Sequence, residues 1–390
     1  MYRILIPEDI AESGKRYLTD RGYELKVGVP TDIPSLKKEI ARADGIIVRN
    51  ASYPKEVFEG AERLKVIARH GIGVDNIDVA AANAQGIWVV NGPGSNSNAV
   101  AEHTVAAIAA LFCRLHLTDR YTRKGDWHYR LQMERREMKG AVLGLIGFGN
   151  IGRLVAEKAA AGFGMEVLAY DMSAAARGGI AQDGTVQTGT VRGVWSGTVQ
   201  GGTAPGGIAQ SSITLGDVSL GGIAQGSIAL GDVSPGGIAQ SSIALGDVSR
   251  SDTPVRILDD LDAVLTRADV VSLHIPCTES TRGLFDYSRF MKMKKGSFFI
   301  NCARGELYVE EDLVRVLEEG HLAGAALDVY QEEPPGDSRL FALEQAICSQ
   351  HNAGISRESK ERMSLQAAIG VDQVLTGQTP SWPVGHPDGI

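Results

Sequence analysis

Short apolar runs alternate with polar, helix-like stretches along the first hundred residues of the chain. A short apolar run bounded by turn residues is typical of a strand that is buried on both faces. Strands that alternate with helices predict an α/β fold with a parallel sheet. We predict strands at 2–7, 23–27, 45–48, 64–68 and 86–90, and helices at 33–42 and 54–60.

The same alternation begins again near residue 140. From Ala141 the pattern is that of a buried strand, a glycine turn and a helix. Further strands are predicted at 270–275, 296–301 and 322–330, and a last helix at 356–375. We therefore expect two α/β domains.

A long apolar helix is predicted at Ala99–Leu117, just before this second domain. It contains Glu102, His103, Arg114 and His116. Polar and charged side chains in an apolar stretch of this length favour a buried helix over a membrane span. We predict no contact with a membrane.

The stretch 178–250 departs from the composition of the rest of the chain. It holds eighteen of the 47 glycines and no Lys or Glu. It contains three copies of one 15-residue unit, at 206–220, 221–235 and 236–250, and a degraded copy that begins at Gly178. Within the unit an Ile or Val recurs every five residues. We treat 178–250 as a tandem-repeat insertion.

Two structures are open for this insertion. The five-residue spacing resembles the pentapeptide-repeat pattern, whose family coils into a four-sided β-helix. The alternative is a recently duplicated, largely irregular loop, because so few repeats bury little apolar surface.

Composition excludes several classes of function. The net charge of −8 and the pI near 5.6 argue against nucleic-acid binding. The four cysteines are far apart and form no C-x-x-C pair, which suits a reducing cytoplasm. The N-terminus has the pattern of a first strand rather than of a signal peptide. The eight histidines show no spacing typical of metal ligands, so we predict no metal site.

A dinucleotide-binding fingerprint lies at the start of the second domain. Gly147, Gly149 and Gly152 fall between a predicted strand and a helix. The first glycine allows the tight turn, the second lets the backbone approach the pyrophosphate, and the third lets the helix pack on the strand. The next strand ends in Asp171, where a carboxylate accepts hydrogen bonds from the ribose and repels a 2′-phosphate. The pattern predicts NAD rather than NADP; the alternative is a glycine turn and a surface aspartate.

Three further residues form a candidate catalytic set. Arg304 follows a predicted strand, at the edge where α/β sheets place their active sites, and its guanidinium can hold a carboxylate. Glu333 and His351 lie in later loops, and a histidine paired with a carboxylate suits a general acid. Residue types alone equally allow an ion-paired Arg, a solvated Glu and a capping His.

A resemblance to a known family joins these observations. The sequences GLIGFGNIG, ADVVSLHIPCTESTRGLF, MKKGSFFINCARGELYVEEDL, LAGAALDVYQEEP and HGIGVDNIDVAAANAQGIWVVN resemble the D-isomer-specific 2-hydroxyacid dehydrogenase family, phosphoglycerate dehydrogenase-like branch, over about 1–177 and 251–380. The resemblance implies that Arg304 binds the substrate carboxylate and polarises the carbonyl, and that Glu333 pairs with the catalytic His351. The segment Ser349-Gln350-His351-Asn352-Ala353-Gly354 lacks the proline and the first glycine of the family's TPHxGG motif.

The resemblance also implies binding residues. The backbone of Gly71, Ile72, Gly73 and Val74 matches the loop that donates N–H groups to the substrate carboxylate. Arg49 and Arg69 fall where phosphoglycerate dehydrogenases carry arginines near the substrate phosphate, although surface ion pairs are the alternative. We assign cofactor binding to the following residues: Gly147, Gly149, Asn150, Ile151, Gly152, Asp171, His274, Pro276, Thr281, Cys302 and Asp328. Cys302 has no histidine placed to activate it, so we do not expect a nucleophile there.

The family's order of motifs predicts a split topology. Residues 1–100, completed by 352–390, would form the substrate-binding domain, and 101–351 an NAD-binding Rossmann domain that carries the insertion. The helix at 99–117 would mediate a homodimer, as is usual in the family. We expect no long, effector-controlled form.

These features predict a cytoplasmic, NAD-dependent oxidoreductase that interconverts a small D-2-hydroxy acid and its 2-oxo acid. Candidate pairs are 3-phosphoglycerate with phosphohydroxypyruvate, and hydroxypyruvate or glyoxylate with their reduced forms. One alternative is an NAD(H)-sensing, corepressor-like binding protein of the same fold. Another is that the repeat insertion provides a partner surface on an enzyme relic.

Overall fold

The computed structural model describes residues 1–172, 185–186, 255–385 and 387. The chain divides into two units, one formed by Met1–Thr188 with Ser251–Ile390 and the other by Gly189–Arg250. Our proposed repeats lie outside the described residues. Of the range 178–250, only Thr185 and Val186 are described.

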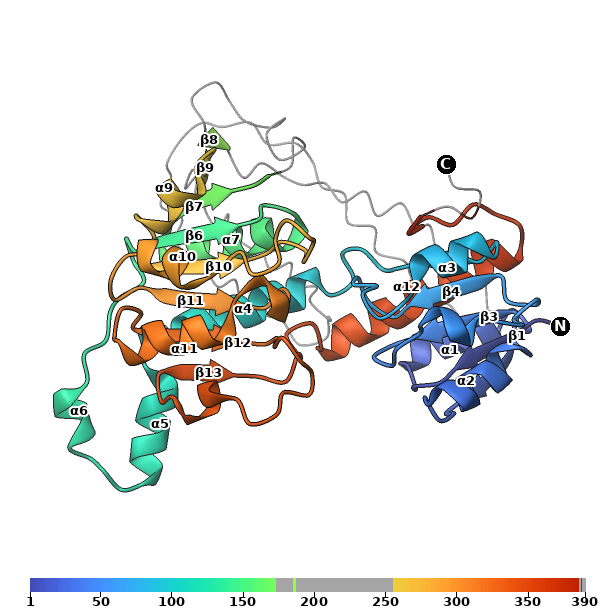
Figure 1. Cartoon of the computed structure of the whole chain (residues 1–390), viewed down its shortest axis with the longest axis horizontal. Helices are drawn as coiled ribbons and strands as arrows, with labels where there is room; N and C mark the ends of the chain where they lie inside the picture. Colours follow the sequence, from blue (N-terminus) through green and yellow to red (C-terminus); the bar gives the residue numbers. More distant parts are fainter. Residues whose placement is uncertain (173–184, 187–254, 386, 388–390) are drawn as a thin grey trace, which may run out of the picture. The chain divides into compact units, whose positions relative to one another are not determined.

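The first domain is built on a five-stranded parallel sheet with the strand order β2-β1-β3-β4-β5 (Figure 1). Its strands are β1 (Arg3–Ile6), β2 (Glu24–Val27), β3 (Gly45–Val48), β4 (Val66–Arg69) and β5 (Trp88–Val90). Its helices are α1 (Glu12–Thr19), α2 (Ile33–Ile40), the 3₁₀ turn η1 (Lys55–Val57), α3 (Val79–Ala84) and the C-terminal α12 (Arg357–Leu375).

The two faces of this sheet bury different sets of side chains. Ile4 and Ile6 point to one face and pack with Ala367 and Val371 of α12, while Leu5 packs in the cluster on the other face. This division follows from the two-residue period of a strand. A capping box between Ser356 and Ser359 fixes the start of α12. The C-terminal helix therefore completes the core of the N-terminal sheet.

The second domain contains an eight-stranded sheet with the order β13-β12-β11-β10-β6-β7-β9-β8, in which only β8 is antiparallel. Its strands are β6 (Val142–Ile146), β7 (Glu166–Tyr170), β8 (Thr185–Val186), β9 (Val255–Leu258), β10 (Val270–Leu273), β11 (Phe298–Asn301), β12 (Gly324–Leu327) and β13 (Ala346–Cys348). Its helices are α4 (Ser97–Phe112), α5 (Leu115–Arg123), α6 (Tyr129–Gln132), α7 (Asn150–Phe163), α9 (Leu261–Leu265), α10 (Tyr287–Lys292) and α11 (Glu310–Glu318), with 3₁₀ turns η2 (Gly305–Leu307) and η3 (Arg339–Ala342).

This sheet is doubly wound. Successive strands extend from β6 through β7 to β9 on one side, and from β10 to β13 on the other. The point where the order reverses, between β6 and β10, is where α/β sheets bind ligands at the carboxyl ends of their strands. The prediction of two doubly wound parallel-sheet domains is confirmed.

The structure differs from the predicted elements in three places. The helix expected over 99–117 breaks at Arg114, which has a left-handed φ of 52°, because the buried α4 gives way to α5, which buries only Leu117. The helix expected over 54–60 is reduced to η1, since Gly60 takes a φ of 78° just beyond it. Thr185 and Val186 fall within the proposed insertion but pair with β9, whose open edge offers backbone hydrogen-bonding groups.

Among the described residues, no single helix has both the length and the apolar composition needed to cross a membrane. By length and composition alone, α4 and α5 pass that test only as a pair, and they are bent by 62° at their junction.

Candidate active site

The glycine turn after β6 has a conformation that only glycine accommodates. Gly147 has a φ of 101°, and a Cβ atom there would overlap the backbone carbonyl of His274. A Cβ atom on Gly152 would overlap the carbonyl oxygen of Gly147, which is how closely α7 packs on the turn. The spacing of the fingerprint thus corresponds to real contacts at the switch point of the sheet.

The start of α7 fits a dinucleotide pyrophosphate. Gly149 is the N-cap residue, and a Cβ atom on it would meet nothing within 4 Å, so space is open in front of the turn. No side chain caps the helix, whose first turn includes Asn150 and Ile151. Uncapped N–H groups at a helix N-terminus attract phosphate. These residues could therefore hold NAD.

Asp171 lies at the end of β7, beside this turn. Its Oδ2 accepts a hydrogen bond of 2.6 Å from the backbone N–H of Phe148. A carboxylate in this place fits the role expected at the adenosine ribose. On the other side of the turn, burial lowers the pKa of His274 to about 4, and its Nε2 lies 3.0 Å from the hydroxyl of Ser272. A neutral, packed His274 agrees with a structural role near the cofactor.

Two further residues assigned to the cofactor, Thr281 and Cys302, are held or buried within the protein. The buried Thr281 donates a hydrogen bond to the carbonyl of Pro276 and accepts one from the N–H of Thr278, which closes the loop after β10. Burial raises the pKa of Cys302 to about 12. Its thiol therefore stays protonated at neutral pH, consistent with the expectation that it is no nucleophile.

The loop Gly71–Val74 presents amide groups. Each carbonyl of the loop accepts a hydrogen bond from the protein. The N–H of Gly92 donates to the carbonyl of Gly71, and the side-chain amide of Asn91 donates to that of Ile72. The guanidinium of Arg69 donates to the carbonyl of Gly73. Among the described residues, the N–H groups of Ile72, Gly73 and Val74 have no such partner. With its carbonyls held, the loop can direct these donors toward a carboxylate.

The two arginines assigned to a substrate phosphate differ. The guanidinium of Arg69 is largely buried and donates to the carbonyls of Gly73 and His70. Burial is the main cause that lowers its pKa to about 10. Arg49 lies at the end of β3 and donates to the carbonyl of Asp9. Arg69 thus stabilises the loop itself.

Arg304 follows β11, and Asn301 at the end of that strand holds its turn. The side chain of the buried Asn301 donates to the carbonyl of Arg304 and accepts from the N–H of Ala303. The guanidinium pairs with the carboxylate of Asp75, with Nη2 at 2.8 Å from Oδ2. It also lies against Gly73, where a Cβ atom would overlap it. Arg304 and the amide loop are therefore brought together.

Glu333 and His351 form the second pair. The Nδ1 atom of His351 lies 2.6 Å from Oε2 of Glu333, and Oε1 of Glu333 accepts a hydrogen bond from the N–H of Tyr330. The imidazole is about half exposed. The carboxylate fixes a proton on Nδ1, which leaves Nε2 as the ring atom that can exchange a proton with a ligand.

His351 keeps its orientation without the proline and glycine that are missing from its loop. Its φ of 50° is left-handed. The buried carboxylate of Asp328 accepts hydrogen bonds from the N–H groups of Asn352 and Ala353 and from the hydroxyl of Ser349. Asp328 was assigned to the cofactor, and in the structure its carboxylate holds the loop that carries His351.

A close backbone contact joins the two pairs. A Cβ atom on Gly305 would overlap the backbone of Tyr330, so the turn after Arg304 packs directly against the chain that leads to Glu333. Only glycine permits this approach. Arg304, Glu333 and His351 therefore lie on the loops that follow β11, β12 and β13, at the carboxyl edge of the sheet.

Sequence reasoning missed three residues of this arrangement, namely Asp75, Gly305 and Ser349. Gly305 could have been found, because it follows Arg304 in the INCARG motif and a glycine there indicates a close approach. Asp75 contacts Arg304, which is more than 200 positions away, and Ser349 contacts Asp328, which is about 20 positions away. No local sequence pattern indicates either contact.

Curated proteins are similar to this chain along nearly its whole length. The chain is 30% identical to a D-3-phosphoglycerate dehydrogenase of Methanocaldococcus jannaschii, with 100% of this chain and 60% of the relative covered. It is 32% identical to the chloroplastic D-3-phosphoglycerate dehydrogenase 2 of Arabidopsis thaliana, with 99% and 50% covered. The chain thus spans about half to three fifths of the length of these curated relatives.

A solved structure of a protein from Thermus thermophilus is 29% identical, with a TM-score of 0.72 over 98% of this chain and 99% of that one. The family model for the NAD-binding domain of D-isomer specific 2-hydroxyacid dehydrogenases matches residues 105–195 and 211–353, which is more than half of the chain. The chain therefore belongs to the D-isomer specific 2-hydroxyacid dehydrogenase family and carries that family's NAD-binding domain.

Proposed function

We propose that the protein is an NAD-dependent oxidoreductase that interconverts a small D-2-hydroxy acid and its 2-oxo acid in the cytoplasm. The observation that carries the proposal is the Glu333–His351 pair, which joins the loops after β12 and β13, beside the loop of Arg304, at the carboxyl edge of a sheet whose glycine turn fits a dinucleotide. Acid, carboxylate-binding and cofactor-binding groups occur together at this edge.

NAD, when bound, supplies the hydride acceptor or, in its reduced form, the donor at substrate C2. The residues of the chain do the rest. Arg304 and the amides of Gly71–Val74 hold the substrate carboxylate, and a guanidinium beside the keto oxygen polarises it. The Nε2 of His351 gives a proton to that oxygen in reduction and removes it in oxidation. Glu333 orients the ring through Nδ1.

The substrate class is proposed from charge and from the relatives. The two curated relatives described above are named D-3-phosphoglycerate dehydrogenases, and Arg49 lies at the end of β3 in the same domain as the amide loop. A guanidinium there suits a phosphate on the substrate. Phosphohydroxypyruvate is therefore our first candidate, followed by hydroxypyruvate and glyoxylate.

Turnover of NADH with a panel of 2-oxo acids tests this proposal. The panel contains phosphohydroxypyruvate, hydroxypyruvate, glyoxylate and pyruvate. The control variant His351→Ala is expected to lower kcat by roughly 10²–10⁴, the range for lost acid–base catalysis, while NADH binding is retained. Turnover of at least one acid, lost in the variant, supports the proposal. NADH binding without turnover of any acid would favour the corepressor-like alternative, which the comparisons do not favour.

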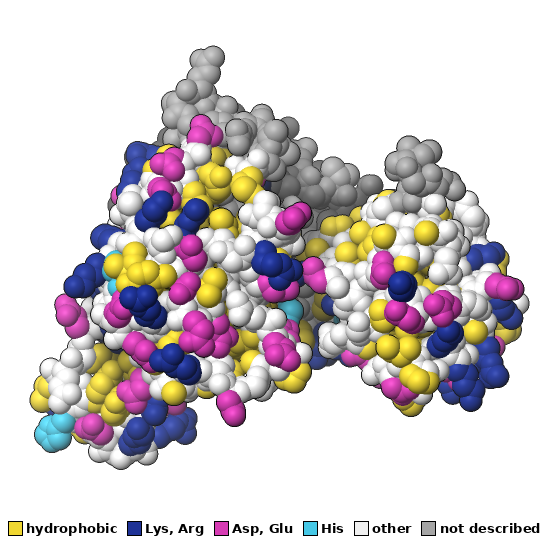
Figure 2. Space-filling view, in the orientation of Figure 1, with side chains coloured by type: hydrophobic (Ala, Val, Ile, Leu, Met, Phe, Trp, Pro, Cys, Tyr) yellow, Lys and Arg dark blue, Asp and Glu magenta, His cyan; other side chains and the backbone are white. Residues whose placement is uncertain are grey.

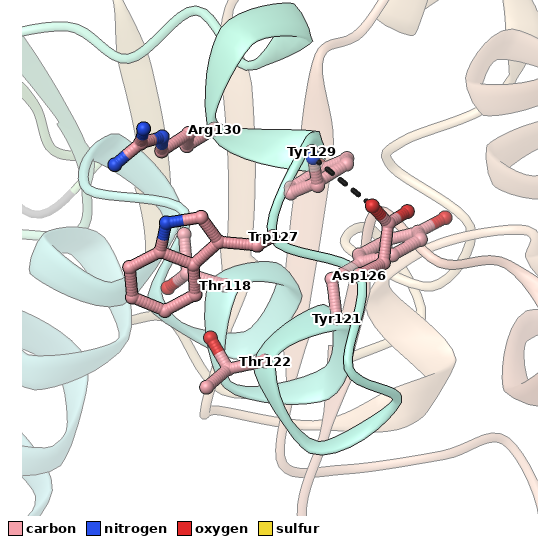
Figure 3. Close-up of a pocket in the computed structure, with 7 residues that line it drawn as sticks. All are labelled: Thr118, Tyr121, Thr122, Asp126, Trp127, Tyr129 and Arg130. Carbon is pink, nitrogen blue, oxygen red and sulfur yellow. Dashed lines mark hydrogen bonds between the residues drawn. The ribbon is translucent and has the colours of Figure 1, made fainter.

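We also propose that a second copy of the chain covers α5 and α6. This region exposes Leu115, Trp127 and Leu131, and Figure 2 shows apolar side chains at this end of the domain. Figure 3 shows the pocket between the two helices, where the rings of Tyr121 and Tyr129 stack with centroids 3.9 Å apart. Exposed apolar side chains that gather in one region are typical of an interaction surface. Leu131→Glu is expected to convert a dimer to a monomer in light scattering.

A further inference from the structure

The carboxylate of Asp75 occupies Arg304. Its Oδ2 accepts a hydrogen bond of 3.0 Å from Nε and lies 2.8 Å from Nη2, while the remaining nitrogen, Nη1, donates to the carbonyl of Ala303 at 2.7 Å. Every nitrogen of the guanidinium thus faces an oxygen of the protein. A second carboxylate can make a forked contact with the Nε–Nη2 edge only if Asp75 leaves it.

The place of this carboxylate is the place proposed for the substrate's carboxylate. A Cβ atom on Gly73 would lie 2.9 Å from Oδ2 of Asp75, and it would overlap the guanidinium of Arg304. The Asp75 carboxylate therefore lies against the loop whose N–H groups, at Ile72, Gly73 and Val74, have no partner among the described residues.

We propose that Asp75 is an internal competitor of the substrate. Its carboxylate occupies the carboxylate-binding edge of Arg304 in the free protein, and the substrate carboxylate displaces it on binding. Asp75 thereby sets the affinity for the acid without taking part in the proton or hydride transfer. This inference rests on the function proposed above.

Displacing the Asp75 carboxylate from Arg304 costs little free energy, because solvent reaches both side chains. The side chain of Asp75 is 64% exposed and that of Arg304 is 30% exposed. Ion pairs between solvent-accessible groups contribute little, because water and salt screen them. The displaced carboxylate can therefore return to water at low cost, and the substrate must overcome only a weak internal contact.

The negative charge of Asp75 weakens anion binding in a second way, because it partly compensates the arginines around the loop. Arg69 lies close enough to Arg49 and Arg304 that both positive charges act on it, and Asp75 acts on it in the opposite direction. Removing the Asp75 charge leaves the arginines less compensated. The site should then bind an anion more tightly, not less.

The test uses the full chain with the substitution Asp75→Asn, which removes the charge and keeps the shape. Two quantities are measured: the KM for the best 2-oxo acid, and the Kd of oxalate in the presence of NADH. Oxalate is an inert dicarboxylate, so its binding does not depend on turnover. Both values are expected to fall by about twofold to fivefold, the range for an exposed ion pair, with kcat within about twofold of the parent.

Two controls locate the effect. Glu62→Gln makes the same change of charge at an exposed carboxylate of the first domain, and it should leave both values unchanged. In an Arg304→Ala background, Asp75→Asn should tighten oxalate binding less than it does in the parent, because the shared partner is gone and only the effect of charge remains. The same tightening in the Glu62 variant would reduce the effect to net charge and overturn the proposal.

An unchanged or larger Kd in Asp75→Asn would also overturn it. A larger KM together with a lower kcat would show that Asp75 positions Arg304 for the substrate instead of competing with it. The two arms separate the inference from the proposed function. If no acid is turned over but oxalate still binds more tightly to the variant, the proposed reaction is wrong while the competition at Arg304 stands.

Discussion

The acid stability of the protein should depend on one buried histidine of the first domain. His70 follows β4 and is 6% exposed, and its Nε2 lies 2.9 Å from the hydroxyl of Ser364 on α12. Burial, with additional repulsion from Arg49 and Arg69, lowers its pKa from 6.5 to about 4. The folded protein therefore opposes protonation of this ring, and the unfolded chain does not.

The sign of the effect follows from proton linkage. Between about pH 6.5 and pH 4 the unfolded chain binds more protons at this position, so stability falls as the pH falls through this window. A difference of about 2.5 pKa units is equivalent to about 3 kcal/mol in the limit, of which about 2 kcal/mol is lost by pH 5. Above about pH 6.5 the contribution is fully present.

The assay compares urea unfolding of the parent and of His70→Gln at about pH 7.5 and about pH 5. Glutamine retains a donor and an acceptor for Ser364 but has no charge to gain. The loss of unfolding free energy on acidification should be smaller in the variant by about 2 kcal/mol. The exposed His128 provides the control, since His128→Gln should lose as much stability as the parent. Equal losses in His70→Gln and the parent would refute this account of His70.

Three further predictions concern the candidate site and the insertion. Asp171→Ala is expected to narrow the preference for NADH over NADPH, because it removes the charge that repels a 2′-phosphate. Both affinities are measured by fluorescence titration. Equal affinities of the parent for NADH and NADPH would contradict the assignment of Asp171. Glu333→Gln should lower kcat, since His351 loses the carboxylate that lies 2.6 Å from Nδ1 and orients its ring, and an unchanged kcat would exclude Glu333 from the mechanism. Replacing Gly189–Arg250 by a short Gly/Ser linker should leave a folded, NADH-binding protein, because the paired strand at Thr185–Val186 is retained and long loops close at little extra entropic cost. An insoluble product would show that this segment belongs to the core.

Local structure and the nature of the two domains can be predicted from the order of the amino acids alone. Strands buried on both faces, such as β3 and β12, appear as continuous apolar runs, and their alternation with helices specifies a parallel sheet. The fingerprint could be located for the same reason, since Gly147 and Gly152 act within a few residues of each other. The break at Arg114 was missed, because no Gly or Pro marks it and packing decides where the helix ends.

The assembly of the candidate site depends on contacts between residues that are distant along the chain. Arg304 and Asp75 lie 229 positions apart, and His351 is oriented by an Asp328 carboxylate from another strand end. Local patterns carry information about neighbours along the chain, whereas these contacts form because parallel strands bring their carboxyl ends to one edge of a sheet. The resemblance to a family could name Arg304, Glu333 and His351, but the internal carboxylate on Arg304 became visible only once the chain was folded.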